Sequence, residues 1–138
     1  MGKGTESTSP AKGKPTNPKD LLGLKKVSMS SIPSSALMGQ AIVHMLGEKK
    51  YGHLNWREKG VRARVYMDAI QRHLHAWNEG EDVDSESGVS HLMHIVACCN
   101  ILYDSMRNGG FVDDRALGED NAWLEEYNKL VLDMLDRV

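Results

Sequence analysis

The chain has 138 residues, a length sufficient for one compact domain and a short tail. Lys and Arg number 17 against 19 Asp and Glu, a formal net charge of -2, so the chain lacks the overall positive field that binds a phosphate backbone. Hydrophobic residues make up 41% and charged residues 26%, the balance of a globular domain. This composition disfavours specific nucleic-acid binding and excludes wholesale disorder.

The cysteines and the lengths of the apolar segments indicate the cellular compartment in which the protein is expected. Cys98 and Cys99 are neighbours, and neighbouring cysteines rarely bridge each other, so we expect no disulfide framework. No apolar run approaches the ~18 residues of a membrane helix, and the N-terminus lacks the apolar stretch of a secretory signal. We therefore expect a soluble, cytoplasmic protein that has no membrane partner.

The N-terminal arm has its own composition. Residues 1–26 hold six lysines against Glu6 and Asp20, a charge of +4, while the remainder carries -6. The arm is also crowded with Gly, Ser, Thr and Pro, which cannot bury enough apolar surface to offset the entropy of ordering. We expect residues 1–16 to form a disordered basic leader. It serves as a solubilising extension or touches nucleic acid or an acidic partner.

Periodic apolar residues predict the first helix. Pro33 prevents a helix from running through it and the two serines that follow can cap the next one, so the helix is expected from Ala36. Gly47 and residues 52–55 interrupt the apolar pattern, so we expect the helix to give way there to a loop that reaches Arg57.

Three further helices complete the predicted fold, from about Val61 to Asn78, Ser90 to Met106 and Glu119 to Arg137. No useful period-2 alternation occurs, so the fold class is all-α with about four helices. Residues 17–114 form the predicted domain, and 115–138 an amphipathic helix that packs on that domain or on a partner subunit. The nearly all-apolar stretch 92–103 needs more cover than one small chain provides, which predicts a homo-oligomer.

Chemically reactive side chains are densest between the second and third helices. They are His73, Glu81, Asp84, Glu86, His91 and His94. His91 and His94 are three residues apart on one helix face, and a helical hairpin would bring His73 beside them. Converging carboxylates repel one another unless a divalent cation neutralises them, and Mg²⁺ or Mn²⁺ accept such oxygen ligands together with phosphate oxygens. The pattern predicts a metal-phosphate site.

Other interpretations of these residues stay open. Cys98, four residues after His94 on the same stripe, could complete a zinc site with the histidines. The acidic residues could instead cap the third helix and favour its positive N-terminal end. An EF-hand is rejected, because Ser87 stands where the calcium loop needs Gly and Met93 where it needs Glu.

The segment from 50 to 57 mixes aromatic, cationic and amide side chains in the way a nucleotide site does. Its candidates are Lys50, Tyr51, Asn55, Trp56 and Arg57, with Arg72 from the second helix. An aromatic ring can stack on a base, Asn55 can read its edge, and the cations can bind phosphates. The alternative is that Trp56 fills the core while Lys50 and Arg57 are solvated.

Four motifs in this order resemble a family of phage proteins: Lys-Tyr-Gly-x-x-Asn-Trp-Arg at 50–57, Arg-His-Leu at 72–74, Gly-Glu-Asp-x-Asp-x-Glu-Ser-Gly at 80–88 and His-x-x-His at 91–94. That family is the dATP/dGTP diphosphohydrolases, related to the MazG-like all-α nucleotide pyrophosphohydrolases. The resemblance covers residues 17–114. It implies metal-dependent hydrolysis of a purine deoxynucleoside triphosphate to its monophosphate and pyrophosphate, by an oligomeric helical assembly.

The chain departs from the MazG pattern, in which Glu-x-x-Glu lies on one helix and Glu-x-x-Asp on the next. Only the second pattern is present, as Glu81-x-x-Asp84 and Glu79-x-x-Asp82. The favoured hypothesis is an enzyme in which Glu81, Asp84 and His73 are catalytic. The predicted ligands of Mg²⁺ or Mn²⁺ are Glu81, Asp84, Glu86, His91 and His94. The alternative is a non-catalytic helical module that binds a nucleotide or a partner protein.

Overall fold

The structure is a computed structural model that describes residues 17–138. The predicted disordered leader, residues 1–16, lies outside the described residues. The chain divides into two units, residues 1–37 and 38–138. Each unit is described by itself.

The first unit contains a short helix, α1 (Pro18–Gly23), and a 3-10 turn, η1 (Met29–Ser31). The side chain of Asn17 caps α1 by accepting a hydrogen bond of 3.0 Å from the backbone N–H of Lys19. Pro18 occupies the first turn, where a missing N–H costs nothing. The sequence-based prediction gave neither element, because both are too short to show a helical period.

Helix α2 (Ser34–Tyr51) begins after Pro33, as predicted, but it ends later than predicted. The prediction that Gly47 ends the helix is wrong, since α2 continues through it for one more turn. A single glycine weakens a helix by about 1 kcal/mol and does not by itself stop one. The helix ends where Gly52 adopts a φ of 99°, so Lys50 and Tyr51 belong to its last turn.

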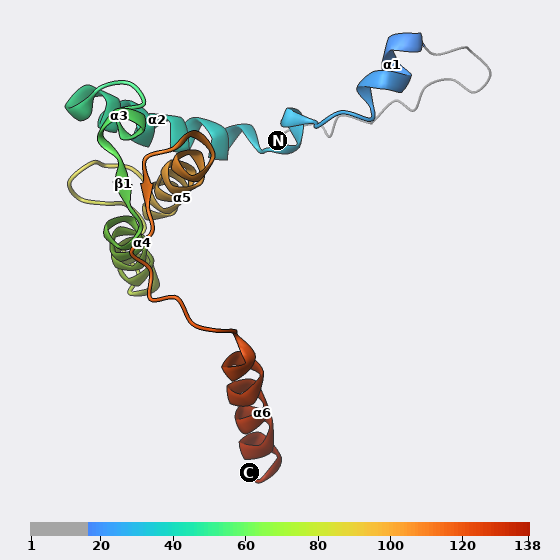
Figure 1. Cartoon of the computed structure of the whole chain (residues 1–138), viewed down its shortest axis with the longest axis vertical. Coiled ribbons are helices and arrows are strands. Elements are labelled where there is room, and N and C mark those ends of the chain that lie inside the picture. Colours follow the sequence, from blue (N-terminus) through green and yellow to red (C-terminus); the bar gives the residue numbers. More distant parts are fainter. Residues whose placement is uncertain (1–16) are drawn as a thin grey trace, which may run out of the picture. The chain divides into compact units, whose positions relative to one another are not determined.

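Helices α4 (Ala63–Asn78) and α5 (His91–Asn108) lie side by side as a hairpin and make the most extensive helix pairing of the described chain (Figure 1). The one-turn helix α3 (Trp56–Lys59) contacts α5. Asn100 on α5 donates a hydrogen bond of 2.6 Å to Gln40 on α2. Met93 reaches Gly39 of α2, where a Cβ would lie 2.7 Å from the methionine sulfur. The small residue therefore lets α2 approach α5 closely.

Two residues expected in the second helix are extended instead. Val61–Arg62 (β1) pairs in parallel with Phe111–Val112 (β2). Gly60 and Gly110 precede these strands with φ of 83° and 84°, and Val61 N donates to Gly110 O at 2.8 Å. Two-residue strands are too short for a period-2 pattern, so the sequence could not reveal them. The all-α fold class is otherwise confirmed by the four main helices of residues 17–138.

The last main helix is α6 (Ala122–Asp136). Its large apolar side chains range from 46% exposed at Leu124 to 62% at Tyr127. On α5, which carries the apolar stretch 92–103, Tyr103 is 68% exposed. Burial in the described chain is confined to a few residues on or beside the hairpin, namely Val61, Ala63, His91, Ala97 and Ser105. None of the helices of residues 17–138 has both the length and the apolar character needed to cross a membrane.

Candidate metal and nucleotide site

The connection between α4 and α5 folds into a turn that positions its acidic residues. Gly80 follows α4 with a φ of 96°, and an isolated antiparallel bridge joins Val83 to Ser90. Inside that bridge the backbone turns at Gly88, whose N–H donates to the carbonyl of Asp84 at 2.8 Å. The Asp84 carboxylate also accepts the N–H of Ser87 at 3.0 Å, so its position is fixed by the backbone.

Three histidines from the two helices meet beside this turn. Nδ1 of His73 lies 2.8 Å from Nδ1 of His91, within hydrogen-bond distance. The His73 ring stacks on His94, with centroids 4.5 Å apart and planes 8° from parallel. The helical hairpin thus brings His73 next to the His91 and His94 pair, which is the juxtaposition that the sequence predicted.

Glu81 orients one of these imidazoles. Nε2 of His91 lies 2.9 Å from Oε1 of Glu81, and the His91 side chain is only 4% exposed. A carboxylate accepts, so His91 donates from Nε2 and keeps its lone pair on Nδ1. That lone pair faces His73, which therefore donates its Nδ1 hydrogen to His91 in the tautomer that satisfies both contacts.

His73, Asp84 and His91 form a group with the spacing of metal ligands. Each offers one ligand atom, and the three atoms all lie within 4.8 Å of one another. His94 is not part of this group. Its Nε2 lies 2.7 Å from the hydroxyl of Ser87 and 3.6 Å from Oδ2 of Asp84. Because the His94 ring is parallel to that of His73, the in-plane lone pairs of the two rings do not converge readily on one ion.

The protonation states of the cluster suit cation binding. Burial lowers the pKa of His73 below its usual 6.5, and the neighbouring His94 and His91 lower it further. Burial also lowers the pKa of His94, against the opposing effect of Asp84. Hydrogen bonds from Ser87 lower the pKa of the Asp84 carboxyl. At neutral pH the two histidines are therefore neutral and the carboxylate is charged.

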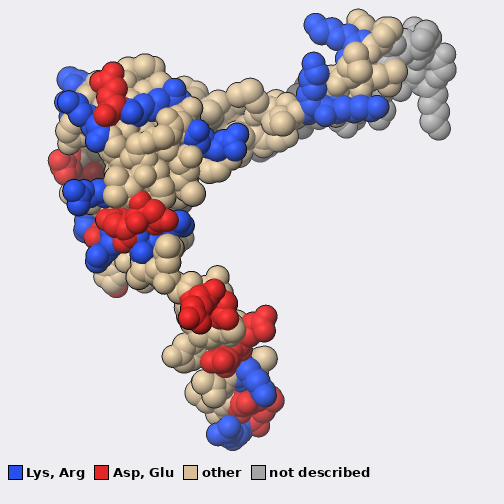
Figure 2. All heavy atoms as spheres, viewed as in Figure 1, with Lys and Arg blue, Asp and Glu red and all other residues tan. Residues whose placement is uncertain are grey.

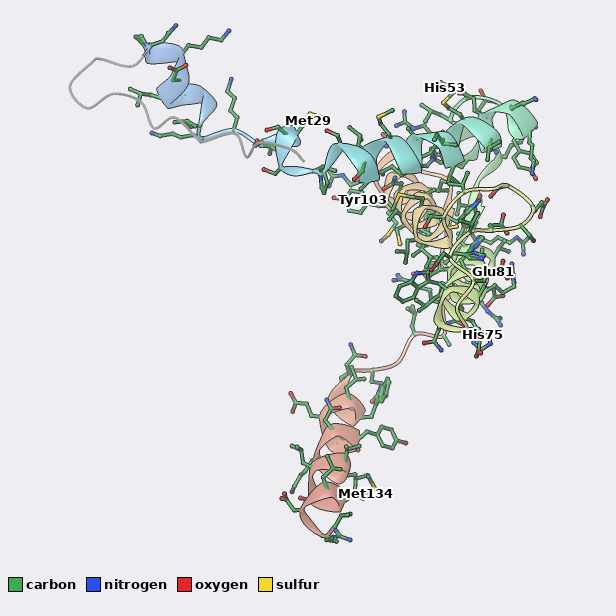
Figure 3. All side chains as sticks on the ribbon, turned by 180° about the vertical axis from the view of Figure 1, so that it is seen from behind. Met29, His53, His75, Glu81, Tyr103 and Met134 are labelled. Carbon is green, nitrogen blue, oxygen red and sulfur yellow. The ribbon has the colours of Figure 1, made fainter. Side chains whose placement is uncertain are left out.

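A cleft of about 520 Å³ opens over this cluster and joins it to the end of α2. Its walls carry Val43, Leu46, Gly47, Lys50, Tyr51, His73, Asp84, Glu86, Ser87 and His94. Lys50 and Tyr51, both predicted to bind a nucleotide, thus share one cleft with the predicted metal ligands Asp84 and Glu86. Tyr51 is 69% exposed, so its ring is free to stack on a ligand. Figure 3 shows Glu81 on the segment that joins α4 and α5.

Other predicted nucleotide residues lie outside the walls of this cleft. Trp56 donates from Nε1 to Asp104 at 2.7 Å, and Arg57 donates to both oxygens of the same carboxylate at 2.9 and 2.8 Å. These bonds keep the pKa of Asp104 far below its usual range. Asn55 precedes α3 and makes no side-chain cap. Arg72 lines a separate depression on α4, with Gln71 and other α4 residues.

The two alternatives for the acidic and cysteine residues are not supported. The side chain that caps α5 is Ser90, which accepts the N–H of Leu92 at 3.2 Å, so the acidic residues are not needed for that role. Cys98 is absent from the ligand group formed by the described residues. Burial raises the pKa of its thiol, which disfavours the thiolate that zinc binds.

Sequence reasoning missed two residues that shape this region. Ser87 donates its backbone N–H to Asp84 and its hydroxyl contacts His94; the available signal is Asp84 three residues earlier, since Asp side chains often accept a nearby backbone N–H. Asp104 carried no local signal, because Trp56 lies 48 residues before it in the chain.

These features define a mostly helical protein with a His-Asp-His ligand group, of which His73 and Asp84 line a cleft formed by α2, α4, α5 and the turn between α4 and α5. A family model described as dATP/dGTP diphosphohydrolase, N-terminal, matches residues 16–115. The chain belongs to this family. It is also 32% identical over 75 residues to a dATP/dGTP diphosphohydrolase of Salmonella phage PMBT28. That match covers 54% of this chain and 25% of the phage protein, so the chain spans about a quarter of its relative. No solved structure matches significantly.

Proposed function

We propose that the protein is a metal-dependent nucleoside triphosphate diphosphohydrolase, which hydrolyses a purine deoxynucleoside triphosphate of the dGTP or dATP class to its monophosphate and pyrophosphate. The observation that carries the proposal is the shared cleft, where two members of the group with metal-ligand spacing, His73 and Asp84, lie with a cation, Lys50, and an exposed aromatic ring, Tyr51. The metal group and the cation suit the phosphates of a nucleoside triphosphate, and the ring suits its base. Family membership supports the reaction class.

The residues of the cleft divide the work as follows. His73, Asp84 and His91 hold the divalent cation, for which the sequence predicts Mg²⁺ or Mn²⁺, and Lys50 neutralises the phosphates. The bound cation supplies charge stabilisation and a lower pKa for attacking water. Glu86 lines the cleft but is outside the three-ligand group, so it is available to accept the proton of the water that attacks the α-phosphorus. The bond from that phosphorus to the bridging oxygen breaks, and pyrophosphate leaves.

The base is held by the aromatic side of the cleft. Tyr51 is the candidate that lines it, whereas the ring of Trp56 is anchored to Asp104 through its indole N–H. Asn55 is the proposed hydrogen-bond partner for the edge of the base. Arg72 is a proposed phosphate ligand if the nucleotide lies along α4. Because its substrate belongs to the cellular nucleotide pool, the proposed enzyme acts in the cytoplasm. If the chain is encoded by a phage, this is the cytoplasm of the host cell.

A non-catalytic nucleotide-binding module is the second candidate. The observation that favours it is that the family model describes the N-terminal part of the diphosphohydrolases and that the match covers a quarter of the phage relative. In such a module the histidines and carboxylates would form a polar network that binds a nucleotide without cleaving it.

The deciding experiment measures pyrophosphate release from a panel of deoxy- and ribonucleoside triphosphates with Mg²⁺, Mn²⁺ or Co²⁺. Turnover of a purine deoxynucleotide that is lost in Asp84→Asn supports the enzyme. Saturable triphosphate binding with no turnover under any metal would rule out the enzyme and leave the binding module.

We also propose that the chain acts as a homo-oligomer. The support is the amount of apolar surface that one chain leaves exposed, on α2 and α5 as well as on α6. Met38 on α2, for example, is 67% exposed. The C-terminal segment 115–138 packs, in this proposal, on the helical domain or on a partner subunit.

A further inference from the structure

We infer that the site selects a first-row transition ion, such as Mn²⁺, Co²⁺ or Zn²⁺, over Mg²⁺, and that Glu81 acts as a positioning residue that holds His91 ready to ligate through Nδ1. The inference shares the metal site of the proposed function and rests on it for location only. It is carried by the contacts of His73, His91 and Glu81.

The first step concerns the donor atoms. Two of the three grouped ligands are imidazole nitrogens and only one is a carboxylate oxygen. Mg²⁺ prefers oxygen ligands and keeps much of its water, whereas imidazole suits the later transition ions. A set of two histidines and one carboxylate therefore discriminates against Mg²⁺ by its chemistry, before any difference in size is considered.

The second step concerns geometry. Nitrogens that bind one ion at ~2.1 Å lie roughly 3.0–3.4 Å apart, depending on the coordination angle. Nδ1 of His73 and Nδ1 of His91 are 2.8 Å apart, so a small opening of the pair admits an ion between them. The hydrogen that His73 donates to His91 then moves to its own Nε2, since both imidazoles bind as neutral groups.

The third step assigns Glu81. Its carboxylate contacts Nε2 of His91, the nitrogen that faces away from His73. A carboxylate that accepts the second N–H of a ligand histidine fixes the tautomer and the ring direction and makes the ligand more basic. Glu81 is 53% exposed and is outside the three-ligand group, so it acts on the ion through His91.

The test uses the full chain after chelator treatment and measures metal binding apart from turnover. Co²⁺ titration followed by its visible d-d absorption should show saturable binding with the intensity and wavelength of nitrogen ligation. A hundredfold excess of Mg²⁺ should leave the spectrum unchanged. Pulsed electron paramagnetic resonance of bound Mn²⁺ should show coupling to ring nitrogens.

Matched variants locate the site. His73→Gln and Asp84→Asn should weaken Co²⁺ binding at least tenfold, whereas His75→Gln should not, because His75 lies on the same helix with its side chain 76% exposed. Glu81→Gln should weaken binding by about 10–100-fold and alter the spectrum, as loss of an orienting partner does. Far-ultraviolet circular dichroism checks folding, and Asp84→Asn and Glu81→Gln keep the test open if His73→Gln is unfolded.

The outcomes separate this inference from the proposed function. Displacement of Co²⁺ by Mg²⁺ at up to a hundredfold excess, unchanged binding in His73→Gln and Asp84→Asn, or unchanged binding in Glu81→Gln would overturn the inference even if triphosphates are hydrolysed. Nitrogen-ligated Co²⁺ without turnover of any triphosphate would instead leave the inference standing and remove the enzyme.

Discussion

At the residue scale, the stacked imidazoles of His73 and His94 make the stability of the hairpin depend on pH. Burial lowers the pKa of both rings below 6.5 in the folded protein. The unfolded chain therefore binds protons more readily than the folded chain as the pH falls. Stability is complete above the unfolded pKa of about 6.5 and is lost progressively as the pH falls through that value toward the lower folded pKa.

We therefore expect the melting temperature of the metal-free protein to fall as the pH is lowered from 8 to 5. Calorimetry at a series of pH values measures this change. His94→Gln removes one of the two rings and should flatten the profile over this window. His75→Gln, on the exposed side of α4, should keep the original slope. A wild-type profile that is flat, or that rises on acidification, would contradict the neutral imidazole pair.

The two cations predicted to bind phosphates differ in what they already contact. Arg57 makes a bidentate ion pair with Asp104, whereas Lys50 lines the cleft. We expect Lys50→Gln to raise KM for the triphosphate about tenfold or more, because the variant loses one hydrogen bond from a charged group, worth ~1.5–3 kcal/mol. Its melting temperature should be unchanged.

Arg57→Gln provides the contrast. Because it removes a partner that ties α3 to α5, this variant should lower the melting temperature by several degrees and leave KM nearly unchanged. If KM rises instead while the melting temperature holds, Arg57 leaves Asp104 to bind phosphate and the prediction from the sequence is right for this residue.

At the element scale, two glycines in different backbone conformations affect stability in opposite directions. A Cβ at Gly110 would lie 3.2 Å from the carbonyl of Trp56, and its φ of 84° suits only glycine well. Gly110→Ala should destabilise the protein by about 1–3 kcal/mol. Gly47 lies inside α2 with open space around it, so Gly47→Ala should stabilise by about 0.5–1 kcal/mol. Urea unfolding measures the free energy of unfolding of both variants. If the two substitutions change it in the same direction, the prediction is wrong.

Sequence periodicity predicted the elements whose apolar pattern extends over several turns. The helices near 63–78 and 91–108 were found within two residues of their bounds. The pairing of Val61 with Phe111 was invisible, because contacts 50 residues apart leave no local trace. For the site, helix spacing predicted that His91 and His94 share a face, but not that the His94 ring stacks on His73 and bonds Ser87. Side-chain direction depends on packing that one sequence does not show.

At the scale of the whole molecule, charge is distributed without a dominant sign. Figure 2 shows cationic and anionic side chains interspersed over the face of the second unit that it presents, consistent with the formal net charge of -2 for the chain. Apolar exposure is the more informative property. Soluble monomers rarely leave large contiguous apolar patches in water, and here apolar side chains of several helices are half exposed or more. These exposed side chains support the proposed assembly of the chain with a second copy.

The final prediction concerns α6, whose apolar residues form a stripe at helical spacing while its charges occupy the other side. Val131 lies on the stripe and is 50% exposed in one chain, and Lys129 lies on the charged side. If α6 is buried between copies, Val131→Glu places a carboxylate in an apolar contact. It should raise the dissociation constant of the assembly by on the order of tenfold or more, since burying an unpaired charge costs well over 1.4 kcal/mol. Lys129→Glu introduces the same residue on the opposite face and should leave assembly nearly unchanged. Sedimentation equilibrium at micromolar concentration measures both variants against the wild type. A wild-type protein that is monomeric throughout this range, or two variants that assemble equally well, would show that α6 has no partner in a second copy.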